Sequence, residues 1–121
     1  MVIDTNILIA YLKGEQQAVI QLSAWKEEGR ALFISPISIA EVLAIAPLSN
    51  TEIAGIKDFL KNFISIPVDD SVAEIAGYFR GTHHVALPDA IIAATAFLRG
   101  VPLITRDQQF KKIKEVTVFE I

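Results

Sequence analysis

MVIDTNILIAYLKG, residues 1–14, decides the fold, because an apolar run stops at an aspartate and a helical pattern follows at once. The run before Asp4 predicts a short buried strand, and aspartate is a residue type that commonly precedes the first turn of a helix. The next apolar side chains recur at helical spacing, and Gly14 provides a stop. This stretch therefore predicts a strand that leads directly into a helix.

The remainder of the chain repeats this alternation. Further strands are predicted at residues 31–35, 65–68, 102–105 and 116–121. Helices are predicted at residues 15–28, 37–45, 51–63, 69–80 and 88–98, with a loop at 81–87 and a short helix or turn at 108–113. Apolar strands that alternate with helices favour a parallel sheet covered on both faces. At 121 residues, we expect one α/β domain spanning residues 1–121.

The composition excludes several classes of protein. Without cysteine, the chain has no disulfide, thiolate zinc site or cysteine nucleophile. His83 and His84, in the predicted loop, also lack the spacing of a zinc site. No apolar stretch approaches the roughly 18 residues that a membrane span needs, and no secretory signal opens the chain, so we expect a cytoplasmic protein. The net charge of −3 is unlike that of most nucleic-acid-binding domains, although bound divalent cations would offset it.

Four acidic residues lie in apolar or tightly structured stretches: Asp4, Glu41, Asp89 and Asp107. Asp4 and Asp107 follow predicted strands, Glu41 is the only charge in its predicted helix, and Asp89 begins a nearly uncharged helix. The carboxyl ends of parallel strands meet at one edge of a sheet, so we expect the four side chains to lie together there. Carboxylates are costly to bury unless they are paired, hydrogen-bonded or bound to a metal. A divalent cation is the simplest partner for all four.

Each acid also has an ordinary structural explanation. Asp4 could serve only as a helix cap, and Asp89 could make a favourable contact with a helix dipole. Asp107 could be a turn residue, and Glu41 could lie on a solvated face that it shares with Ser38. The occurrence of all four in one short chain favours the metal site over these separate explanations.

Four segments together resemble a PIN domain: MVIDTN at residues 1–6, ISIAEVLA at 37–44, LPDAIIAATA at 87–96 and LITRDQQF at 103–110. More narrowly, they resemble the small VapC-type ribonuclease toxins of prokaryotic toxin–antitoxin pairs. The resemblance covers essentially the whole chain. It implies an α/β/α sandwich around a parallel sheet and an endoribonuclease that depends on Mg²⁺ or Mn²⁺. It also implies an RNA substrate, a homodimer and inhibition by a cognate antitoxin.

The resemblance assigns roles to particular residues. The family's acidic positions are matched by Asp4, Glu41, Asp89 and Asp107. Its polar residue beside the first acid is matched by Asn6, and its threonine before the last acid is matched by Thr105. Independently of the family, Thr5 or Asn6 could hydrogen-bond phosphate or order the carboxylates. Many relatives carry a further acid immediately before the phenylalanine, where this chain has Gln109. That departure puts the ligands of a second metal in question.

The chemistry of these ligands suits a hard cation, because carboxylate oxygens favour Mg²⁺ or Mn²⁺ over zinc or copper. We expect Asp4 and Asp89 to bind the first metal, with Glu41 and Asp107 completing it through waters or binding a second. Such a metal lowers the pKa of water and stabilises charge on phosphoryl oxygens. The family resemblance implies products with a 5′-phosphate and a 3′-hydroxyl.

Two other functions remain open from the sequence. A non-catalytic interaction module would use the amphipathic helix at residues 51–63 as its binding face. A phosphotransfer receiver would need a mid-chain acid, for which Asp69 and Asp70 are the candidates. If the chain is a toxin, the helices at residues 15–28 and 51–63 could form a groove for an antitoxin helix, with Phe59 contacting it.

Overall fold

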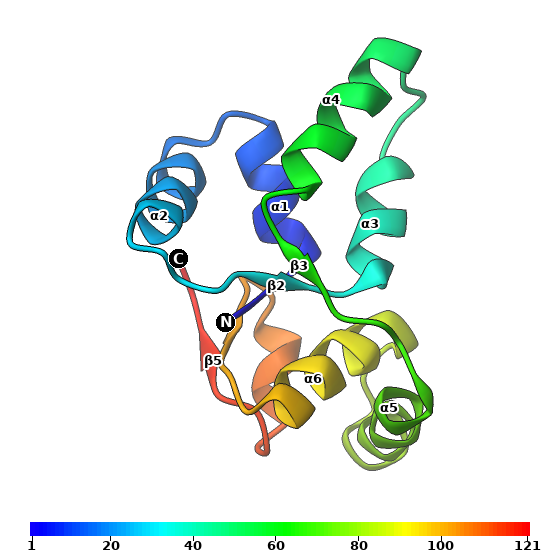
Figure 1. Cartoon of the computed structure of the whole chain (residues 1–121). Coiled ribbons are helices and arrows are strands. Elements are labelled where there is room, and N and C mark those ends of the chain that lie inside the picture. The colour runs from blue at the N-terminus through cyan, green and yellow to red at the C-terminus, as the bar shows by residue number, and fades with distance from the viewer.

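Five short parallel strands form the centre of the computed structural model, which describes residues 1–121 (Figure 1). The strands are β1 (Val2–Ile3), β2 (Phe33–Ile34), β3 (Ile64–Ser65), β4 (Leu103–Ile104) and β5 (Val118–Phe119). They lie in the order β3-β2-β1-β4-β5, which places β1 between β2 and β4. In this register Val2 lies beside both Phe33 and Leu103, and Ile3 lies beside Ile104.

Helices cover both faces of this sheet. They are α1 (Thr5–Leu12), α2 (Gln16–Glu27), α3 (Pro36–Leu43), α4 (Asn50–Leu60), α5 (Asp70–His83) and α6 (Leu87–Arg99), with the short 3-10 helix η1 (Gln108–Lys112). Figure 1 shows α1 to α4 on one side of the strands and α5 and α6 on the other. The predicted α/β/α sandwich around a parallel sheet is therefore confirmed. None of the helices has the length and apolar character to cross a bilayer.

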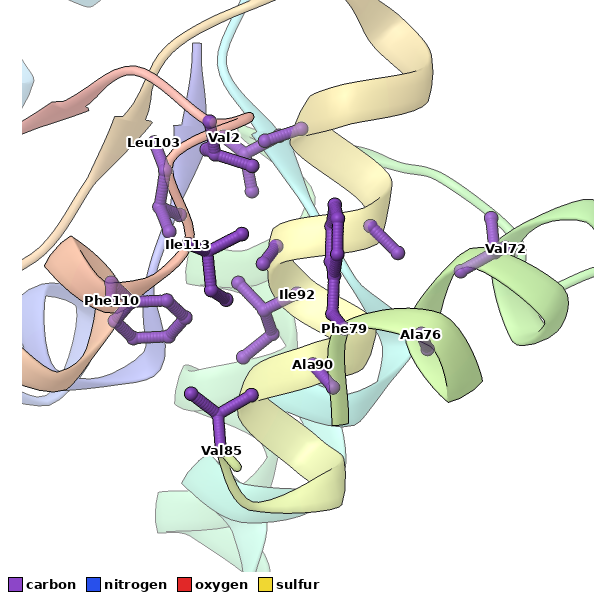
Figure 2. Packing of buried hydrophobic residues seen from close by; sticks show 14 of the residues in the cluster. Val2, Val72, Ala76, Phe79, Val85, Ala90, Ile92, Leu103, Phe110 and Ile113 are labelled. Carbon is purple, nitrogen blue, oxygen red and sulfur yellow. The ribbon is translucent and has the colours of Figure 1, made fainter. Parts of the chain in front are cut away.

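Two separate cores follow from the alternation of side chains along the strands. Val2 and Leu103 point into a core formed with α5, α6 and the segment after β4. Figure 2 shows this core, in which Phe79 and Ile92 pack near those two strand residues. The other residue of each central strand, such as Ile3, points into a second core with α1 to α4. The strands β1, β2 and β4 thus each contribute one side chain to each core, which is why both of their residues are apolar.

Helices α1 and α5 begin at the capping residues expected from the sequence. The Asp4 side chain accepts a hydrogen bond at the start of α1, and Asp69 accepts one from the Val72 amide at the start of α5. Gly14 and Gly100 follow α1 and α6 with φ of 77° and 67°, a conformation that glycine adopts without steric cost. The helix predicted at residues 51–63 is observed as α4, which begins one residue earlier and ends at Leu60.

The predicted loop at residues 81–87 is wrong in its first half. Helix α5 continues through Gly81 to His83, since an isolated glycine weakens a helix without ending it. The helix ends at His84, which has a left-handed φ of 56° and donates its amide to the Arg80 carbonyl at 3.1 Å. His83 therefore lies on the last turn, where its Nε2 is 2.9 Å from a carboxylate oxygen of Glu115.

The predicted strand at residues 65–68 is also displaced. The observed strand β3 is Ile64–Ser65, and the Ile66 amide still donates to the Ile34 carbonyl at 2.9 Å. Pro67 comes next and has no amide hydrogen, so the ladder cannot continue. This edge strand is exposed at both residues.

Candidate active site

The four acidic residues lie at one edge of the sheet, where the carboxyl ends of β1 and β4 meet. Asp4 directly follows β1, and its amide donates to the carbonyl of Ile104 on the neighbouring strand at 2.9 Å. Asp107 lies three positions after Ile104, the last residue of β4, and caps η1. Asp89 lies in the first turn of α6, and Glu41 lies on α3. We call these four side chains the acidic edge.

Asp4 is the most enclosed member of the acidic edge, with 4% of its surface exposed. Its Oδ1 accepts from the Thr5 amide at 2.8 Å, and its Oδ2 accepts from the Thr105 hydroxyl at 2.6 Å. Burial raises the pKa of Asp4 to about 6, the two hydrogen bonds oppose that rise, and the charges of Asp89 and Glu41 add to it. Asp4 is therefore a buried carboxylate that lies within the field of two others.

Thr105 is the centre of a hydrogen-bond network beside Asp4. Its hydroxyl donates to Asp4 and accepts from the Asn6 side-chain amide at 3.3 Å and from the Asp107 backbone amide at 3.0 Å. Asn6 Oδ1 in turn accepts from the Arg106 amide at 3.4 Å. Since Thr105 Oγ1 is fully hydrogen-bonded, it fixes the ends of β1 and β4 relative to each other.

Glu41 is held by residues on α1 and α3. Its Oε1 lies 2.7 Å from Thr5 Oγ1, which also lies 2.8 Å from the hydroxyl oxygen of Ser38. Thr5 and Ser38 are buried, whereas Glu41 is half-buried. The carboxylate of Glu41 is thus anchored on its inner side and open on its outer side.

Asp89 is half-buried at the start of α6. Its pKa is raised by burial first, then by the charge of Asp107, and then by the charge of Glu41. Asp107 accepts a hydrogen bond from the Gln109 amide at 2.9 Å. The charges of Asp89 and Glu41 thus act on Asp4, and the charge of Asp107 acts on Asp89, so each acid lies within electrostatic range of at least one other.

The ligand chemistry of the acidic edge fits a hard divalent cation. It offers carboxylate oxygens supported by hydroxyl and amide groups, and no histidine or cysteine is among them. As arranged, no group of three or more acidic or histidine side chains is positioned to hold a single ion. The carboxylates are close enough to repel one another, and repulsion of this kind is relieved by a bound cation.

Comparisons with known proteins identify the family. The sequence model of the PIN domain matches residues 1–116. This chain belongs to the PIN domain family. Ribonuclease VapC10 of Mycobacterium tuberculosis is 31% identical over an alignment 110 residues long, which covers 87% of this chain and 80% of that protein. The resemblance to PIN domains and VapC-type ribonucleases is therefore confirmed.

Solved structures of the same fold extend this comparison. A toxin–antitoxin complex from Klebsiella pneumoniae contains a chain that is 34% identical, with a TM-score of 0.83 over 99% of this chain and 98% of that one. VapBC2 from Rickettsia felis, solved with a DNA fragment from its promoter, has a TM-score of 0.84 at 20% identity, over 98% of this chain and 96% of that one. The second likeness concerns the fold alone.

Within this PIN domain, Ser38 is hydrogen-bonded to Thr5, the residue that contacts Glu41, and this role was not predicted from the sequence. Its position three residues before Glu41 on one helix was the available signal, because such residues share a face. His83 does not join the acidic edge, since it pairs with Glu115. Lys111 pairs with Glu120 at 3.0 Å on the surface.

Proposed function

We propose that this PIN domain is a VapC-type toxin that hydrolyses RNA phosphodiester bonds with Mg²⁺ or Mn²⁺. The observation that supports the proposal most strongly is the acidic edge, where the buried Asp4 lies within the electrostatic field of Asp89 and Glu41. Buried carboxylates without basic partners are costly to maintain, and a cation-dependent reaction gives them a use. The similarity to VapC10 over most of the chain supports the same activity.

The residues proposed to hold the metal are Asp4 and Asp89, with Glu41 and Asp107 completing its coordination or binding a second ion. When bound, a divalent cation activates water and stabilises negative charge on phosphate oxygens. Thr105 hydrogen-bonds both Asp4 and the amide of Asp107, so it fixes the position of Asp4 relative to the start of η1. Thr5 orients Glu41. Asn6 supports Thr105 from the first turn of α1. These neutral groups position the carboxylates without adding charge to the site.

We also propose that a cognate antitoxin binds a groove beside the C-terminal end of α1. The groove lies between α1, α2 and α4 and is lined by Tyr11, Leu22, Ser23, Lys26, Leu32, Phe59, Asn62 and Phe63. We call it the aromatic groove, because Tyr11 and Phe59 stack with ring centroids 4.6 Å apart and Phe63 packs edge-on to Phe59 at 5.2 Å. Its walls include the two helices expected from the sequence. An amphipathic helix is the partner whose shape and chemistry suit such a groove.

The comparison with toxin–antitoxin complexes supports an antitoxin partner. We propose that the active protein is a homodimer. We also propose that it acts on RNA in the cytoplasm.

The test is RNA cleavage by purified protein with and without Mn²⁺. Asp4→Asn and Asp89→Asn should each abolish metal-dependent cleavage, because each removes a carboxylate from the proposed metal site. Glu74→Gln is the matched control, since Glu74 is an exposed acid on α5. Melting temperatures would establish that the variants are folded. Retained metal-dependent cleavage in Asp89→Asn, or a wild-type protein that binds an antitoxin and cuts no RNA, would favour the interaction module instead.

A further inference from the structure

Ser38 makes a buried contact that ordinary packing does not require. Its side chain is fully buried, and the hydrogen-bond partner of its hydroxyl is the Thr5 hydroxyl at 2.8 Å. Ser38 lies on α3 and Thr5 begins α1, so the contact joins two helices. A buried hydroxyl is costly without a partner, and this one is satisfied only through the residue that contacts Glu41.

The direction of these hydrogen bonds follows from proton counting. Glu41 Oε1 lies 2.7 Å from Thr5 Oγ1, and an ionised carboxylate can only accept. The single hydroxyl proton of Thr5 therefore points to Glu41. The Ser38 hydroxyl must then donate the remaining hydrogen bond, of 2.8 Å, to Thr5 Oγ1. The three side chains form a directed chain from the interior to the acidic edge.

Such a chain restricts the rotation of the carboxylate in two ways. A hydroxyl that accepts a hydrogen bond becomes a stronger donor, so Ser38 strengthens the bond from Thr5 to Glu41. Ser38 also holds Thr5 Oγ1 in the one orientation that leaves its proton aimed at the carboxylate. Ser38 and Glu41 lie three residues apart on α3, which keeps both on the face that meets α1.

We infer that Ser38 is a positioning residue that sets the orientation of Glu41 through the Thr5 hydroxyl, for the ribonuclease reaction proposed above. Ser38 touches neither substrate nor metal in this role. Its contribution is to keep a half-exposed carboxylate pointed toward its acidic neighbours before any ligand arrives. Supporting residues of this kind typically change metal affinity or activity by about tenfold to a hundredfold.

The decisive experiment measures Mn²⁺ binding by calorimetry in the absence of RNA, and RNA cleavage separately. Ser38→Ala should weaken Mn²⁺ binding by about tenfold or more and lower kcat with little change in KM. Ser38→Thr keeps the hydroxyl and should therefore have the Mn²⁺ affinity and kcat of the wild type. Thr95→Val is the matched control, because the buried Thr95 hydroxyl donates within α6 to the Ile91 carbonyl. It should lower stability and leave Mn²⁺ affinity at the wild-type value.

A double variant tests the path through Thr5. If Ser38 acts only through that hydroxyl, adding Ser38→Ala to Thr5→Val should weaken Mn²⁺ binding no further. Additive effects of the two changes, or wild-type Mn²⁺ affinity in folded Ser38→Ala, would overturn the inference. If the wild type cuts no RNA while the Mn²⁺ affinities follow the predicted pattern, the proposed function fails and the positioning role of Ser38 stands.

Discussion

The acidic edge and the aromatic groove lie toward opposite ends of α1, and different forces maintain them. The edge begins at Thr5, where buried hydroxyls and carboxylates are held by hydrogen bonds of defined direction. The groove begins at Tyr11, where stacked rings contribute apolar area. The two regions are close, because an eight-residue helix is only about 12 Å long. They share no side chain, since the residues of the edge do not line the groove. Changes at one should therefore leave the other intact.

Removing divalent cations should separate the two regions most sharply. A chelator should abolish RNA cleavage and leave antitoxin affinity unchanged, because the groove contains no cluster of acids. Cleavage assays and binding measurements on the same sample would show this. Addition of Mn²⁺ should recover activity, and cleavage that persists in excess chelator would contradict a metal-dependent edge.

The pH dependence of stability should reveal the buried carboxylate of Asp4 in protein kept free of metal. Its folded pKa of about 6 exceeds the ordinary value of 3.8, so the folded state binds this proton more tightly than the unfolded state. The stability that protonation provides is complete below pH 3.8 and lost as the pH rises through 6, a change of roughly 3 kcal/mol at most.

Asp4→Asn removes the group that titrates, so the variant does not lose this stability as the pH rises. The free energy of unfolding of the variant, relative to that of the wild type, should therefore increase between pH 4 and pH 8. Urea unfolding across that range measures the pH-dependent part of the difference. A difference that is constant with pH would mean that Asp4 is not desolvated in the fold.

Thr105→Val should impair the acidic edge without adding or removing charge. It deletes the hydroxyl that donates to Asp4 and accepts from Asn6 and Asp107. We expect cleavage to fall by about tenfold to a hundredfold, since the carboxylates lose their supporting contacts. Thr105→Ser keeps the hydroxyl and serves as the control, and equal activity of the two variants would show that the network is dispensable.

Phe59→Ala should give the smallest of these effects and act on the other region. It removes the ring that stacks on Tyr11 and lines the groove, so antitoxin binding should weaken by at least about 1 kcal/mol. RNA cleavage should stay at the wild-type rate. Unchanged antitoxin affinity in this variant would place the antitoxin on another surface.

The sequence predicted the parallel sheet well, because its central strands are marked by local patterns. The apolar run before Asp4 and the one before Thr105 define neighbouring strands, and residues after parallel strands must meet at one edge. Thr5 and Asn6 are expected at the same edge, because they come directly after Asp4 in the chain. Whether these residues bind a metal stays a prediction.

The contacts that the sequence could not predict depend on how helices pack. The hydroxyl contact from Ser38 to Thr5 requires α3 to lie against α1, which no periodicity specifies. The extension of α5 to His83 depends on the left-handed turn at His84, and the contact of His83 with Glu115 follows from it. Glycine at position 81 suggested a stop, but an interior glycine only weakens a helix.

The hydrogen bond from Thr105 to Asp4 spans 101 positions of the chain. Because donor and acceptor are so far apart in sequence, the contact depends on the pairing of two distant strands, β1 and β4, rather than on local structure. Long-range contacts form slowly, because a long loop of chain must close before they are gained, so the acidic edge should be among the last parts of the molecule to assemble during refolding.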